Sequence, residues 1–288
     1  MNKTTNVPKK ENAIWRELKK NKSAIIGLVM ILIIILVAIF ADFLVDYEEQ
    51  VIAQNPIERL QPPSKEHWFG TDAFGRDIFA RIIYAARPSL AVGVMAVVIA
   101  LLIGTSLGII AGYYGGWIET LIMRTADAFI SIPSILLAIC IASSLGQGVG
   151  VLMIAIGVVS CASFTRIACA AVLPIRGQEF IEAAVSSGAS DFHIIVSHII
   201  PNCLAPIIVQ ATMRVASAII LASSLSFLGL GIPAPAPEWG GMLSEGRNFI
   251  RDYSYLTLIP GAAIVVTVLS INLLGDGLRD AMDPKLRR

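Results

Sequence analysis

Long apolar stretches alternate with shorter polar ones along most of this chain. A membrane-spanning helix needs about 20 predominantly apolar residues, and several of the stretches reach that length. They cover residues 24–45, 89–112, 118–145, 151–172, 204–231 and 256–274. The pattern therefore predicts an all-α integral membrane protein with six transmembrane helices.

The distribution of cations indicates how these helices are oriented. Lysines and arginines crowd residues 1–22, before the first apolar stretch, and recur at the end as Lys285, Arg287 and Arg288. Because such residues favour the cytoplasmic side, and six spans return the chain to its starting side, we expect both termini in the cytoplasm. The polar residues 46–87 and 232–255 then form outer loops, and residues 176–202 lie inside. We treat 1–22 as a cytoplasmic segment and 23–288 as one membrane domain.

Composition agrees with a membrane protein and excludes several functions. The chain is 56% hydrophobic and 15% charged, against about 25% charged residues in soluble domains. Its net charge is +1, with no basic domain that would indicate nucleic-acid binding. No Gly-Lys pair occurs in the sequence, so a Walker A loop is absent and we do not expect this chain to hydrolyse ATP.

Metal chemistry and intramembrane proteolysis also find little support. The cysteines lack a CxxC spacing and the histidines lack an HExxH pattern, so we expect no metal site. Asp276 invites comparison with membrane aspartyl proteases, which need a second aspartate to share its proton. Only Asp127 could supply one. The flanking Gly275 and Gly277 are equally typical of a helix end.

Charges within the apolar stretches admit two interpretations. Arg124 and Asp127 are three residues apart, so we expect an ion pair on one helix face, with a kink at Pro133 nearby. Arg214 is the most deeply placed charge, and we favour structural pairing or snorkelling for it. The alternative is a pathway of charges in a stand-alone channel or proton-coupled carrier.

Small residues recur along the second stretch. Gly93, Gly104, Gly108 and Gly112 lie near a four-residue spacing. Small residues on one face let transmembrane helices approach closely. We predict that this face is a packing face.

The polar segment 176–202 has its own internal pattern. Helix-forming residues around Glu182, Ala183 and Ala184 are followed by Gly188 and then by Ile199, Ile200 and Pro201. Glycine turns the chain without a Cβ penalty, and proline ends a helix or begins the next element. We predict two short helices joined by a bend at Gly188, a docking feature carried between membrane spans.

This spacing resembles the EAA loop of ABC-importer permeases. The stretches Phe69–Asp72, Gly75–Asp77, Leu225–Gly231, Trp239–Leu243 and Asn272–Pro284 are similar to the branch that handles dipeptides, oligopeptides, glutathione or nickel, and to its "C" type permease. The resemblance implies a type I importer permease fold with cytoplasmic coupling helices. It assigns ATPase coupling to Glu182, Ala183, Ala184, Gly188, Asp191, Ile199 and Pro201.

The resemblance also implies partners. They are a paired "B" type permease, two ABC ATPase subunits that bind ATP and Mg²⁺, and an external substrate-binding protein in a bacterial inner membrane. This chain itself would bind no cofactor. Its function would be to form half of the path for di- or oligopeptides, with glutathione or nickel chelates as the alternative cargo.

Two further groups of residues are candidates for function. For a substrate path or gate, they are Arg214, Ser226 and Phe227. For contact with the binding protein outside the membrane, they are Trp68, Asp72, Arg76, Asp77 and Trp239.

Overall fold

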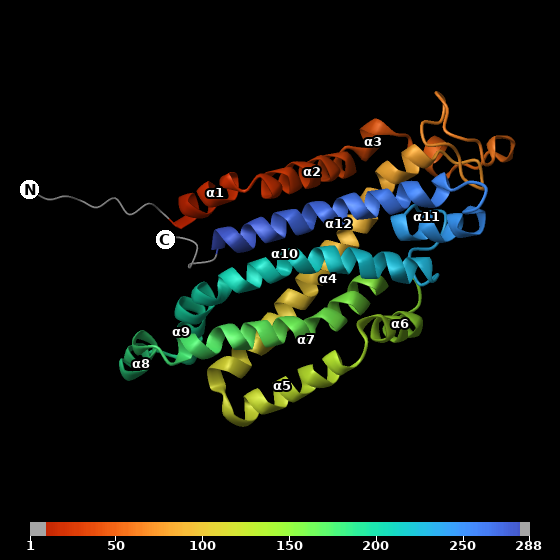
Figure 1. The fold of residues 1–288 in the computed structure, drawn as a ribbon. Coiled ribbons are helices and arrows are strands. Elements are labelled where there is room, and N and C mark those ends of the chain that lie inside the picture. Colours follow the sequence, from red (N-terminus) through yellow and green to blue (C-terminus); the bar gives the residue numbers. More distant parts are fainter. Residues whose placement is uncertain (1–9, 283–288) are drawn as a thin grey trace, which may run out of the picture.

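The computed structural model describes residues 10–282 and folds them into an elongated bundle of helices (Figure 1). Every named element in this range is helical, and the terminal cations before Lys10 and after Met282 lie outside it. The helices are α1 (Lys10–Lys20), α2 (Lys22–Ile39), α3 (Ala41–Leu44), α4 (Ile78–Tyr114), α5 (Gly116–Ser131), α6 (Ser134–Leu145), α7 (Val149–Arg176), α8 (Glu179–Ser186), α9 (Asp191–Ile194), α10 (Ile200–Phe227), α11 (Trp239–Gly246) and α12 (Tyr255–Met282).

The predicted all-α membrane fold is confirmed. In the described part of the chain, 5 helices are long and apolar enough to span a membrane, and the number becomes 6 if α5 and α6 form one broken span. We expected residues 118–145 to form one kinked helix, but the two helices meet at 92°. Pro133 lacks an N–H and forces Ile132 into an extended conformation, which interrupts the helix completely.

Helix α4 begins earlier than the apolar pattern predicts, at Ile78 rather than Ser89. The carboxylate of Asp77 accepts the Ala80 N–H at 2.9 Å and so caps the helix. The polar residues Arg81 and Arg87 are therefore helical, not part of an outer loop.

The last helix ends later than expected. We interpreted Gly275–Gly277 as a helix end, but α12 continues through both glycines to Met282. A Cβ at Gly277 would collide with Ala24, and one at Gly275 would lie 3.2 Å from Met213. These glycines permit close helix packing instead of terminating the helix.

The predicted glycine face of α4 is confirmed as a packing face. Cβ atoms at Gly104 and Gly108 would collide with the backbone oxygens of Cys161 and Thr165 on α7. A Cβ at Gly93 would lie 2.5 Å from Ile219 of α10. The long helix α4 therefore forms the centre against which α7 and α10 pack.

The prediction of an ion pair between Arg124 and Asp127 is wrong. Asp127 of α5 instead lies 3.8 Å from Arg166 of α7, and both side chains are about half exposed. The contact joins two helices across the bundle surface rather than two turns of one helix.

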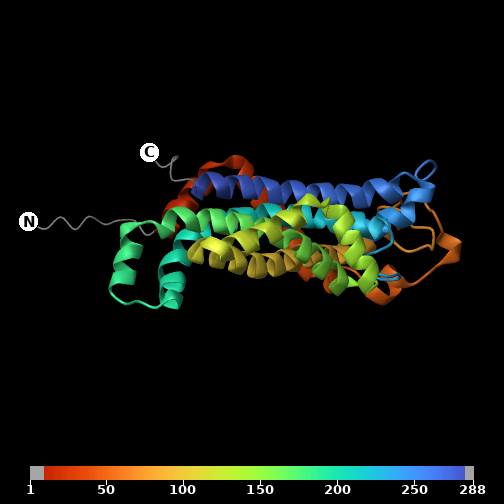
Figure 2. The same ribbon diagram turned by 90° about the horizontal axis from the view of Figure 1, so that it is seen from below.

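The two ends of the bundle differ in character. Helices α8 and α9 extend beyond one end, where α1 and the last turn of α12 also lie (Figures 1 and 2). Residues 46–77 and α11 cover the opposite end. This arrangement brings the first and last described helices together at one end, as an even number of spans requires.

Candidate functional site

Residues 176–202 form the projection seen in Figure 2. We call this segment the coupling loop, after the role that its resemblance to importer permeases implies. Helices α8 and α9 are separated by Gly188, whose φ is +78°. This left-handed conformation is unfavourable for residues with a Cβ. The predicted pair of helices with a bend at Gly188 is confirmed as a structure.

Buried isoleucines attach the coupling loop to the bundle. Ile181 of α8, Ile194 of α9 and Ile199 pack with Val172, Ile175 and other apolar residues at the ends of α4, α7 and α10. Asp191 accepts a 2.8 Å hydrogen bond from the hydroxyl of Tyr113, at the end of α4. The loop is therefore positioned by contacts with the spans and not by its own residues alone.

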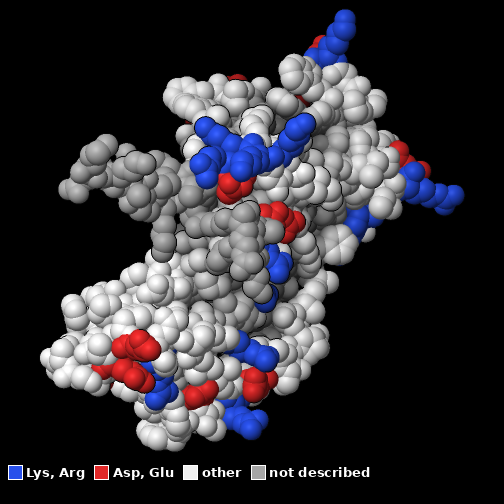
Figure 3. Space-filling model, turned by 60° about the vertical axis from the view of Figure 1, so that its left-hand side comes forward, with Lys and Arg blue, Asp and Glu red and all other residues white. Residues whose placement is uncertain are grey.

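The opposite side of the coupling loop is exposed. Glu182 and Ala183 face solvent, while Ala184 is half-buried. Two apolar side chains are also exposed, Val185 at 56% and Phe192 at 77%. Acidic and basic side chains gather on this end of the molecule (Figure 3). An exposed surface of mixed apolar and charged residues is typical of a docking site.

The chain continues from α9 into α10 without leaving the helical path. Residues Ile195–Ile199 form one π-helical turn, and Pro201 lies in the first turn of α10, where its missing N–H is tolerated. Pro201 therefore begins the next element, one of the two predicted alternatives. The result is a continuous helical segment from Asp191 to Phe227.

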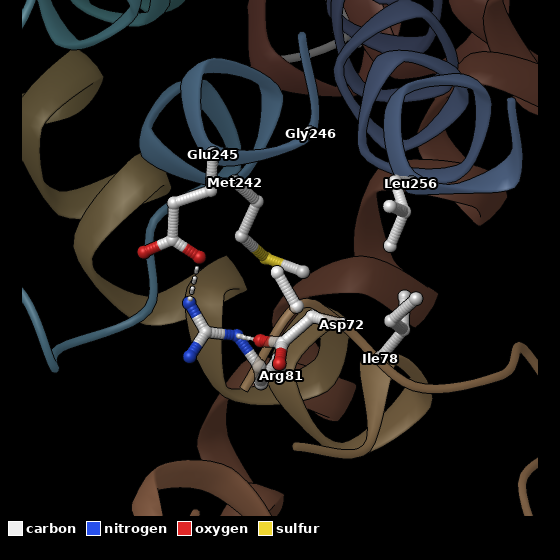
Figure 4. Close-up of a pocket in the computed structure, with 8 residues that line it drawn as sticks. Asp72, Ile78, Arg81, Met242, Glu245, Gly246 and Leu256 are labelled. Carbon is white, nitrogen blue, oxygen red and sulfur yellow. Dashed lines mark hydrogen bonds and ion pairs between the residues drawn. The ribbon is translucent and has the colours of Figure 1, made fainter. Parts of the chain in front are cut away.

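An ion cluster forms the core of the end opposite α8 and α9, the end that the sequence predicts to lie outside and that we call the outer end. Arg76 donates from Nε to Asp72 Oδ2 at 2.6 Å and from Nη2 to Glu245 Oε2 at 2.7 Å. Arg81 Nη2 reaches the same Glu245 oxygen at 3.1 Å, and Figure 4 shows this guanidinium between Asp72 and Glu245. The cluster joins residues 46–77, α4 and α11.

The candidate contacts for an external protein separate into exposed and buried residues. Trp68 is 65% exposed and remains a candidate. Asp77 is half-buried, because it caps α4 and lies 2.8 Å from His67 Nδ1. Asp72, Arg76 and Trp239 are buried at 7%, 2% and 2% exposure. The expectation of direct contact is wrong for these three, which hold the outer end together.

The third group of candidates does not form one site. Arg214 lies near the middle of α10 and lines a cavity of about 500 Å³ between α10, α7 and the α5–α6 break. Ser226 and Phe227 lie at the end of α10, where Phe227 is contacted by the Arg247 guanidinium at 5.7 Å. Ser226 is buried. Only Arg214 therefore faces a cavity large enough for a small ligand.

Sequence reasoning missed three residues that complete these sites. Tyr113 holds the coupling loop, Glu245 pairs with both buried arginines, and Ser163 accepts a 2.9 Å hydrogen bond from Arg214 Nη2. Only Ser163 had a usable signal, since Ser160 and Ser163 lie three apart in an apolar stretch.

The sequence matches two family profiles. Residues 104–288 match the family described as "Binding-protein-dependent transport system inner membrane component". Residues 12–63 match the "N-terminal TM domain of oligopeptide transport permease C". Together the two matches cover most of the chain.

Individual relatives agree with these profiles. The chain is 53% identical to the dipeptide transport system permease protein DppC of Alkalihalophilus pseudofirmus, over 95% of this chain and 90% of that protein. It is 42% identical to the glutathione transport system permease protein GsiD of Pectobacterium atrosepticum, again over 95% and 90%.

A solved structure supports the fold. The inward-facing MetNI methionine ABC transporter superimposes with a TM-score of 0.58 at 17% identity, covering 70% of this chain and 96% of that chain. The fold is thus that of an ABC-importer permease. From the profile and the relatives together, the chain belongs to the family of binding-protein-dependent transport system inner membrane components.

Proposed function

We propose that this chain is the "C" type permease subunit of an ATP-driven importer of di- or oligopeptides, and that it forms half of the transmembrane path. The observation that carries the proposal is the coupling loop, whose buried isoleucines fix it to the spans while Glu182 and Ala183 remain exposed. The name of the dipeptide permease that is 53% identical to this chain favours peptides as the cargo.

The continuous helix from Asp191 to Phe227 suggests how the motion would travel. The helical segment of 37 residues follows a path of about 55 Å at 1.5 Å per residue, and it bends where α9 meets α10 (Figure 2). When two ATPases close around ATP, they would displace α8 and α9, and this helix would carry the displacement past Arg214. ATP would thereby change the relative stability of an inward-open and an outward-open state.

The proposed assembly contains a paired "B" type permease, two ATPase subunits and an external binding protein in a bacterial inner membrane. The end bearing α8 and α9 faces the cytoplasm with both termini, and ATP and Mg²⁺ bind the ATPases. The binding protein meets the opposite end, where Trp68 is exposed. A zwitterionic peptide needs such an enclosed path, because burial of its charges in lipid is very unfavourable.

Glutathione is the second candidate cargo, because relatives named as glutathione permeases share 42% and 44% identity with this chain. Nickel chelates stay a further expectation from the resemblance. Identification of the ligand that copurifies with the binding protein would separate these cargoes.

Reconstitution in vesicles tests the function itself. The complete complex should take up radiolabelled dialanine when ATP is enclosed in the vesicle lumen, on the side where the ATPases lie. Omission of the ATPases or of the binding protein should abolish uptake. Uptake by the permease pair alone, with no ATPase present, would instead identify a stand-alone channel or carrier.

A further inference from the structure

A polar cavity lies halfway along the bundle, away from the coupling loop and the outer ion cluster. Its volume is about 500 Å³, within the range of pockets that bind small ligands. Helices α7 and α10 form two of its walls, and Phe129 and Ile135, on either side of the α5–α6 break, contribute to a third.

Hydroxyl groups recur on the cavity-lining faces of both long helices. On α10, Ser217 lies three residues after Arg214 and Ser224 lies seven residues after Ser217, and α7 contributes Ser160 and Ser163. Residues three, four and seven apart share one face of a helix. Arg214 is the one charged residue in this lining.

Arg214 differs from the buried arginines of the outer end. Arg76 and Arg81 lie within 4.0 Å of carboxylates, whereas among residues 15–282, whose side chains the structure describes, no carboxylate lies that close to Arg214. Its only side-chain partner there is Ser163, bound through Nη2. A half-buried cation at membrane depth is costly without an anion.

A carboxylate is the anion that best fits this site. The guanidinium group presents parallel N–H donors that match two carboxylate oxygens. Every peptide with a free C-terminus carries a carboxylate, whatever its side chains. A site that binds this group could therefore accept peptides of many sequences, while neighbouring hydroxyls exchange hydrogen bonds with the peptide backbone.

We propose that Arg214 binds the C-terminal carboxylate of a peptide as it crosses the membrane, with Ser163 holding the guanidinium in place. This inference rests on the proposed peptide-import function. The competing partner is a carboxylate on the paired permease, which would make Arg214 part of a subunit contact.

The test compares two probes in the complete complex reconstituted in vesicles. Dialanine and its C-terminal amide are each supplied at concentrations that saturate the binding protein, and uptake is measured for wild type, Arg214→Gln and Arg214→Lys. Copurification of the ATPases confirms assembly. We expect Arg214→Gln to lower dialanine uptake by about tenfold or more, the loss expected for one charge-assisted pair, and to change amide uptake by less than about twofold. Arg214→Lys keeps the charge and should recover much of the dialanine uptake.

Two further variants keep the test decisive. Ser163→Ala should lower dialanine uptake selectively and to a smaller extent, because the guanidinium loses its hydrogen bond but not its charge. Arg166→Gln is the matched control, since Arg166 pairs with Asp127 outside the cavity, and it should leave the ratio of the two probes unchanged.

Equal loss of both probes in Arg214→Gln would overturn the inference and indicate a carboxylate on the paired permease. Unchanged uptake of both would overturn it as well. In either case wild-type peptide uptake would leave the proposed function intact, whereas a wild-type complex that imports no peptide would contradict both.

Discussion

The hydroxyl of Tyr113 donates a 2.8 Å hydrogen bond to Asp191 Oδ1. Tyr113 lies in the last turn of α4 and Asp191 begins α9. The bond therefore joins the central helix of the bundle to the helix that would meet the ATPase.

Removal of this bond should loosen the coupling loop without unfolding the spans. We expect Tyr113→Phe to cost about 1 kcal/mol locally, or roughly a fivefold increase in amide hydrogen exchange over residues 189–194. Asp191→Asn keeps an acceptor oxygen and should have a smaller effect. Equal exchange in Tyr113→Phe and wild type would contradict this role.

The glycine face of α4 predicts a difference between two equivalent substitutions. A methyl group at Gly108 would collide with Thr165 O, whereas Gly150, also helical, has no neighbour within 4 Å of its would-be Cβ. Gly108→Ala should lower the stability of the detergent-solubilised complex by about 1–3 kcal/mol. Gly150→Ala should be neutral or stabilise by up to about 1 kcal/mol. If Gly108→Ala and Gly150→Ala had the same thermal unfolding midpoint, α4 and α7 would not be in close contact at Gly108.

The outer ion cluster predicts a strong dependence on Glu245. Glu245→Ala would leave Arg76 and Arg81, both with side chains 2% exposed, sharing Asp72 alone. Loss of one partner from a buried ion pair costs about 3–5 kcal/mol, so the thermal midpoint of the complex should fall markedly. Glu66→Ala, at an exposed glutamate of the same outer region, should leave the midpoint near that of wild type. An equal, small effect of both variants would refute the structural role of the cluster.

The helix boundaries show where sequence patterns are insufficient. Arg81 and Arg87 interrupt the apolar pattern and made the start of α4 look like a loop. Their charges are compensated by Glu245 and Asp42, which are remote in sequence. Likewise, Gly277 looks like a helix end until Ala24 of another helix is found against it. Both features depend on tertiary contacts that local pattern cannot reveal.

The candidate sites also separate into features that local sequence predicts and features that depend on tertiary contacts. The bend at Gly188 follows from local chemistry, and the sequence alone predicts it. The burial of Trp239 does not, because its ring N–H donates to Ile82 O on α4 and its environment comes from the folded outer end. Arg214 was identified as a candidate, but its cavity required the positions of α7 and α10.

The central claim is that the coupling loop transmits ATP-driven motion, and Gly188 tests it most directly. Gly177 provides a matched control in the same loop, since its φ is −87° and no atom lies within 4 Å of a Cβ built there. Valine at Gly188 would occupy a left-handed conformation at a cost of about 1–3 kcal/mol, so α8 and α9 should move apart from their docked arrangement.

The decisive measurement is peptide-stimulated ATP hydrolysis by the reconstituted complex. We predict that Gly188→Val lowers it by about fivefold or more, in proportion to that strain, while membrane insertion stays intact. Gly177→Val should remain within about twofold of wild type, because φ is negative at this position and a Cβ there meets no neighbour. Full stimulation in Gly188→Val, with the protein inserted and assembled as in wild type, would contradict the account.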